Sequence, residues 1–121
     1  LVLGPGSWFT SVLPHLLVAP VREAFTRAAA TKVLVVNVKA QVGETTGFTP
    51  ERYLQNLAST FPDVRLDAVI VDPSSVHDHT TLRQSCAAVG AEPVIEEVRA
   101  AGSGDVHDTL LLASVLQRLL G

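Results

Sequence analysis

The residue types suited to ligand binding and catalysis gather in four short segments of this 121-residue chain. Glycine, serine, threonine, histidine and aspartate concentrate in segments 4–11 ("GPGSWFTS"), 39–47 ("KAQVGETTG"), 72–79 ("DPSSVHDH") and 99–108 ("RAAGSGDVHD"). Each segment comes at the end of a short run rich in apolar and β-branched residues. These four segments are therefore the candidate sites for chemistry.

The first segment has the composition of an anion-binding loop. Gly4 and Gly6 allow a ligand to approach the backbone closely, while Ser7, Thr10 and Ser11 place hydroxyls near the expected start of a helix. Backbone N–H groups at a helix start attract phosphate or diphosphate. The segment matches neither G-x-G-x-x-G nor G-x-x-x-x-G-K-[ST]. Taken alone, Ser7 is more typical of a helix N-cap than of a ligand contact.

The second segment joins two glycines to an amide, a carboxylate and two hydroxyls, with little apolar filler. Gln41 and Glu44 could hold sugar hydroxyls, and Thr45, which follows Gly43 in the same turn, could contact a phosphate oxygen. Any single one of these residues could equally belong to a solvated turn. The set as a whole favours a binding loop.

The histidines differ in what they indicate. His77 and His79 lie two residues apart, a spacing that does not suit the usual metal sites and favours a solvated helix start. His107 and Asp108 precede the last helix. Asp108 could orient the His107 ring or simply cap that helix, and the sequence leaves both readings open. No catalytic triad can be assembled, and Cys86 is expected to be a small buried residue within a helix.

The elements that must position these segments alternate regularly. Four β-rich runs, "LVL", "KVLVVNV", "DAVIVD" and "PVIEEV", are separated by helical stretches. Thr49, Pro50 and Glu51 predict the start of one helix, Gly90 the end of another, and Asp108 or His107 the start of the last. The pattern predicts a three-layer α/β/α sandwich with a mainly parallel, Rossmann-like sheet. All four segments should then lie at the carboxyl edge of that sheet, where α/β proteins bind ligands.

The composition of the chain argues against nucleic-acid binding and against a membrane span. The chain is 47% hydrophobic, has a net charge of −3 and contains no Lys/Arg cluster, so nucleic acid is not an expected partner. The longest uncharged stretch is interrupted by glycine and proline and suits neither a membrane span nor a signal peptide. The single cysteine excludes an internal disulfide and fits a cytoplasmic protein.

Three motifs, in this order, resemble the C-terminal part of the gluconeogenesis factor family (YvcK-type proteins), which is related to the 2-phospho-L-lactate transferases. The motifs stand in "LVLGPGSWFTSVLPHLLV", "NVKAQVGETTGFTPERYLQNL" and "HDTLLLASVL", and the Trp8-Phe9 pair is typical of the actinobacterial branch. The matching residues are Gly4, Pro5, Gly6, Ser7, Phe9, Thr10, Ser11, Pro14, Asn37, Gln41, Gly43, Glu44, Thr45, Gly47, His107 and Asp108. Departures are Val42, Thr46 and Val106, where the family commonly has Pro, Asp and often Arg.

The resemblance implies that residues 1–121 form one α/β unit, the C-terminal part of a longer nucleotide-sugar-binding protein. It implies a cytoplasmic regulator that binds a UDP-sugar such as UDP-N-acetylglucosamine and supports gluconeogenic growth, cell-wall synthesis and cell shape. No reaction is attached to this branch; the alternative is a transferase of the phospho-lactate type. No cofactor is expected within these residues, and a divalent metal would belong to the full-length relatives. An apolar sheet edge and self-association are also expected.

Overall fold

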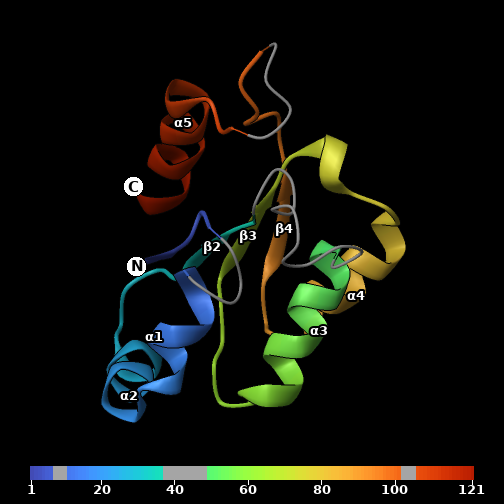
Figure 1. The fold of residues 1–121 in the computed structure, drawn as a ribbon. Helices are drawn as coiled ribbons and strands as arrows, with labels where there is room; N and C mark the ends of the chain where they lie inside the picture. The colour runs from blue at the N-terminus through green and yellow to red at the C-terminus, as the bar shows by residue number, and fades with distance from the viewer. Residues whose placement is uncertain (7–10, 37–48, 102–105) are drawn as a thin grey trace.

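The computed structural model describes residues 1–6, 11–36, 49–101 and 106–121 (Figure 1). Its centre is a four-stranded sheet in the order β1-β2-β3-β4, and every neighbouring pair is parallel. The strands are β1 (Val2–Leu3), β2 (Val33–Val35), β3 (Ala68–Val71) and β4 (Glu92–Ile95). The predicted parallel sheet is confirmed, although β1 and β2 are each shorter than their apolar runs.

Four helices cover one face of the sheet. They are α1 (Leu13–Leu17), α2 (Ala19–Arg27), α3 (Pro50–Thr60) and α4 (His79–Ala88), and the short 3-10 turn η2 (Pro73–Ser75) precedes α4. The strands follow one another across the sheet, so successive right-handed crossovers place their helices on the same face. Buried side chains from all four helices, among them Leu16, Phe25, Leu54 and Leu82, share one core with the strands.

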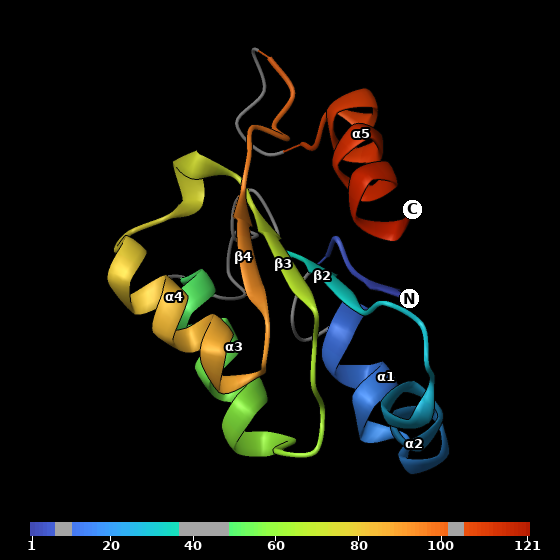
Figure 2. The same cartoon turned by 180° about the vertical axis from the view of Figure 1, so that it is seen from behind.

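The last helix, α5 (Thr109–Leu120), covers the opposite face (Figure 2). Val115 packs there against a second core that contains Val33, Val35 and Ile70. Neighbouring β2 residues alternate between the cores, since Leu34 and Val36 belong to the first. This alternation explains why β2 is continuously apolar, as predicted for a strand covered on both faces, and it confirms the three-layer arrangement.

The helix ends follow the local signals in the sequence. Thr49 caps α3 by accepting a hydrogen bond from the Arg52 N–H at 3.3 Å, and Pro50 is the first helical residue, as predicted. α4 ends just before Gly90, whose φ of 78° is a left-handed conformation that glycine adopts easily. α1 begins at Leu13, and a break at Val18 separates it from α2. The expected start of the first helix near Ser7 and Thr10 lies outside the described residues.

Candidate functional site

The carboxyl edge of the sheet gathers three of the four predicted segments, as the parallel strands require. Residues 4–6 and Ser11 follow β1, residues 72–78 follow β3, and the described part of 99–108 follows β4. Ser7 and Thr10 lie outside the described residues, as do Gln41, Gly43, Glu44 and Thr45. Their predicted roles therefore remain predictions.

The "GPG" turn lies directly against the end of β2. Gly4 has a φ of 78°, and a Cβ atom added to it would come within 2.5 Å of the Val35 carbonyl oxygen. Gly6 has a φ of 152°, and its Cβ would meet the Cβ and Oγ of Ser11 at 2.3 Å. Only glycine can take these conformations this close to neighbouring atoms. The turn therefore folds back on Ser11 and places its backbone beside β2.

The fourth segment forms a small antiparallel hairpin. The Ala100 N–H donates to the Val106 carbonyl at 2.8 Å, and the Asp108 N–H donates to the Val98 carbonyl at 2.7 Å. Between these two bonds Arg99 lies directly opposite His107. The hairpin returns the chain over the ends of β2 and β3 before α5 begins, and this return brings His107 to the site.

Asp72, the first residue after β3, anchors the hairpin. Its Oδ2 accepts hydrogen bonds from the Val98 N–H at 2.9 Å and the Arg99 N–H at 3.0 Å. Its Oδ1 accepts from the Ser74 N–H at 2.9 Å and the Ser74 hydroxyl at 2.6 Å. Burial raises the pKa of this carboxyl, but the hydrogen bonds from Ser74, Val98 and Arg99 outweigh burial and leave the pKa below its usual value. The carboxylate is therefore charged and fully engaged.

His107 lies between the ends of two strands. The backbone of Val36 acts as an acceptor for its ring, and the Asp72 carboxylate is close enough to influence its charge. Burial lowers the pKa of His107, and the Val36 and Asp72 contributions, which raise it, only partly compensate. Nε2 is buried and has no hydrogen-bond partner of ordinary geometry among the described residues. The His107 ring therefore links the end of β2 to the carboxylate that follows β3.

The role left open for Asp108 is decided by its contacts. Its Oδ1 accepts hydrogen bonds from the Leu110 and Leu111 N–H groups at 2.9 and 3.0 Å, so it caps α5. The carboxylate that acts on His107 is instead Asp72. Sequence reasoning placed Asp72 in the third segment but gave it no role. Its position directly after a buried strand was the available signal.

A second buried carboxylate was also missed. Glu51, in the first turn of α3, is only 4% exposed. Its Oε1 accepts a hydrogen bond from the Asp78 N–H at 3.4 Å, which links α3 to the start of α4. Its Oε2 has no partner within the described ranges. The nearby Cys86 is fully buried in α4, as predicted, and burial followed by the charges of Glu51 and Glu92 raises its pKa to about 11.

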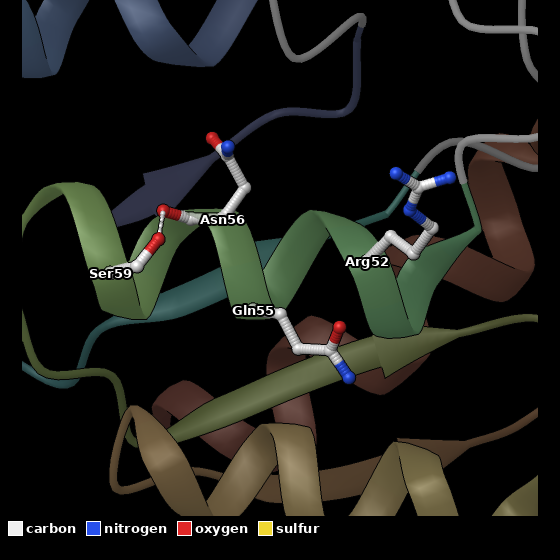
Figure 3. A pocket seen from close by; sticks show the side chains of 4 residues that line it. All are labelled: Arg52, Gln55, Asn56 and Ser59. Carbon is white, nitrogen blue, oxygen red and sulfur yellow. Dashed lines mark hydrogen bonds between the residues drawn. The ribbon is translucent and has the colours of Figure 1, made fainter.

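The hollow on α3 and the exposed histidines His77 and His79 lack the converging polar groups found at the carboxyl edge of the sheet. A shallow hollow of about 370 Å³ is lined by Arg52, Gln55, Asn56 and Ser59, all from α3 (Figure 3). His77 and His79 are exposed, as expected for a solvated helix start. In the described ranges no three His, Cys, Asp or Glu side chains gather as metal ligands would. Nor does any helix in those ranges have the length and apolar character needed to cross a membrane.

Comparison of the sequence with known proteins finds relatives that share one name, gluconeogenesis factor. A protein of Mycobacterium tuberculosis (strain H37Rv) with a gluconeogenesis-factor name is 40% identical over 118 residues, 95% of this chain and 34% of its own length. The gluconeogenesis factor of Bacillus subtilis is 33% identical over 136 residues, 99% of this chain and 42% of its own length. The chain thus spans between a third and a half of these relatives.

Solved structures agree with the sequence comparisons. The crystal structure of a UPF0052 family protein from Bacillus halodurans matches with a TM-score of 0.76 at 27% identity. The match covers 99% of this chain and 42% of that protein. The family model of the 2-phospho-L-lactate transferase CofD matches residues 1–110. The chain belongs to the CofD family, and within it resembles the gluconeogenesis factors.

Proposed function

We propose that this chain forms the C-terminal part of a binding site for a nucleotide sugar of the UDP-N-acetylglucosamine type. The protein would act in the cytoplasm as a regulator that supports gluconeogenic growth, cell-wall synthesis and cell shape. The observation that carries the proposal is the convergence of two distant segments on the end of β2: Gly4 packs on the Val35 carbonyl, and His107 meets the Val36 backbone.

The chemistry of these segments supports a phosphorylated ligand. The "GPG" turn places its main chain at this edge beside β2, and backbone N–H groups of such turns suit an anion. The His107 side chain, which follows β4 and contacts the Val36 backbone, adds a polar group at the same edge of the sheet. A diphosphate joined to a polar sugar needs such an extended set of contacts.

Calorimetric titration of the full natural chain with UDP-N-acetylglucosamine tests the proposal. We expect saturable binding that Gly6→Val abolishes, because a side chain at Gly6 collides with Ser11 and displaces the turn. Gly90→Val is the matched control, since Gly90 also has a positive φ but lies at the far end of α4. Absence of binding by the folded wild-type protein would refute the proposal.

A transferase of the 2-phospho-L-lactate type is the alternative, and the CofD family match favours it. Any metal that such a reaction needs would require ligands beyond the described residues, because no three His, Cys, Asp or Glu side chains gather within the described ranges. Phosphorus NMR of the full natural chain with Mg²⁺, a nucleoside-diphosphate-linked phospho-lactate and an alcohol acceptor would detect transfer. A new phosphodiester signal would establish the enzyme.

A further inference from the structure

We propose that the Arg99 guanidinium contacts the phosphates of the bound ligand, so that the hairpin over β2 and β3 is an anion-binding arm. The inference rests on the proposed function and assigns a residue and a ligand group to one side of that site. It is argued from the pairing of Arg99 with His107 and from the carboxylates around them.

The hairpin places Arg99 and His107 on the same side. The flanking bonds, from Ala100 to Val106 and from Asp108 to Val98, leave these two residues as a non-hydrogen-bonded antiparallel pair. In such a pair the side chains point to the same face and their Cβ atoms are closer than at a hydrogen-bonded pair. The Arg99 side chain therefore starts beside the His107 ring, whose Nε2 lacks a partner among the described residues.

The Asp72 carboxylate fixes the first strand of the hairpin to the end of β3. The Arg99 N–H, which cannot bond across the hairpin at this position, donates instead to the Asp72 carboxylate. That carboxylate also accepts from Val98, so both residues before the turn are fixed to the end of β3. A guanidinium on an anchored backbone is better placed for a ligand than one on a free loop.

The acidic groups near Arg99 are already engaged. Asp72 accepts four hydrogen bonds, Asp108 caps α5, and Glu96 pairs with Arg118. Glu97 is exposed, and within the described ranges neither it nor another carboxylate forms an ion pair with Arg99. Within the part of the chain that the structure describes, the Arg99 side chain is exposed and has no acidic partner, and a planar fork of N–H donors suits a phosphate.

His107 adds a neutral polar group beside the positively charged Arg99 side chain. Burial lowers the pKa of His107, so the ring is neutral at neutral pH and the positive charge of the pair belongs to Arg99. The "GPG" turn also packs on the end of β2, and it has no charged side chain. Arg99 would therefore supply the charge that the first segment, which has no Lys or Arg, cannot.

The test measures binding of UDP-N-acetylglucosamine and of UDP to Arg99→Gln, Arg99→Lys and Arg83→Gln in the full natural chain. Loss of a charged hydrogen bond should weaken both ligands about ten- to hundredfold in Arg99→Gln. Arg99→Lys should lose less, because it keeps the charge. Arg83, an exposed residue of α4, is the matched control and should leave binding unchanged. The salt dependence of binding should also become shallower in Arg99→Gln.

The outcomes separate this inference from the proposed function. If wild type binds both ligands and Arg99→Gln binds them equally well, the Arg99 assignment is wrong and the binding site stands. If Arg99→Gln weakens only the sugar-bearing ligand, Arg99 contacts the sugar and the assignment is again wrong. If the folded wild-type protein binds neither ligand, the proposed function fails together with this inference. Melting temperatures show whether each variant is folded.

Discussion

The Val98 N–H donates to the Asp72 carboxylate across 2.9 Å, although 26 residues separate the two in the chain. This bond fixes the point where the backbone leaves β4 and turns toward the hairpin. The same carboxylate acts on the charge of His107. One buried side chain thus joins the end of β3, the start of the hairpin and the candidate ligand residue.

Replacing Asp72 by Asn should destabilise the protein by about 1.5–3 kcal/mol, because an amide cannot accept all the hydrogen bonds that the carboxylate accepts. Asp78→Asn is the control: Asp78 caps α4 through one oxygen, and Asn is an equally good cap. Urea unfolding followed by circular dichroism measures both. Equal stability of Asp72→Asn and wild type would contradict an anchoring role.

The stability should fall in two windows as the pH is lowered. The folded pKa of His107 lies below its unfolded value, so its contribution is complete above about pH 6.5 and is lost as the pH falls through the folded pKa. The pKa of Asp72 is also lowered, and its contribution is lost below about pH 3.9. His107→Gln should flatten the first window and Asp72→Asn the second, in unfolding curves recorded from pH 8 to pH 3. If a variant still loses stability over the pH range assigned to its replaced residue, another titrating group causes that loss.

Gly4→Ala should cost more stability than Gly90→Ala, although both glycines have a φ of 78°. Backbone strain costs about 1–2 kcal/mol at each position. At Gly4 the new Cβ would also lie 2.5 Å from the Val35 carbonyl oxygen, whereas at Gly90 its nearest neighbour is 3.7 Å away. Thermal unfolding of the two variants compares them directly. Equal losses would mean that the first turn is not packed on β2 as described.

Asp108→Asn should leave both stability and ligand binding near wild type, because Asn can accept the same bonds from Leu110 and Leu111. Asp108→Ala should lose about 1 kcal/mol of stability, since it removes the cap of α5. Chemical denaturation gives the first quantity and calorimetry the second. Reduced binding by a fully stable Asp108→Asn would show that Asp108 does orient His107.

Exposed apolar side chains should make the isolated chain self-associate. Val2 of the edge strand β1 is 41% exposed, and Leu110 of α5 is 78% exposed. Sedimentation velocity over a range of concentrations should show association that Val2→Lys reduces. Gln117→Lys, an added charge on an exposed position of α5, is the control. A concentration-independent monomer would contradict this expectation.

The sequence by itself determined the order of the strands and helices and the edge at which three of its four polar segments lie. The cap at Thr49, the stop at Gly90 and the continuous apolar run of β2 are local signals, because they depend on residues a few positions apart. Parallel alternation of strands and helices then fixed the common edge of the segments that follow them. The contact of Gly4 with the Val35 carbonyl is different, because residues 31 positions apart make it and no local signal indicates it.

Only the tertiary structure decided which residues meet at that edge. Asp72 reaches Val98, and Arg99 lies opposite His107, through a hairpin whose register no short motif specifies. Asp108 looked like the natural partner of His107 because it is next in the chain, yet its carboxylate is turned to α5. Side-chain pairing across elements depends on the full packing of the sheet and its connections, and neighbouring positions in the sequence do not encode it.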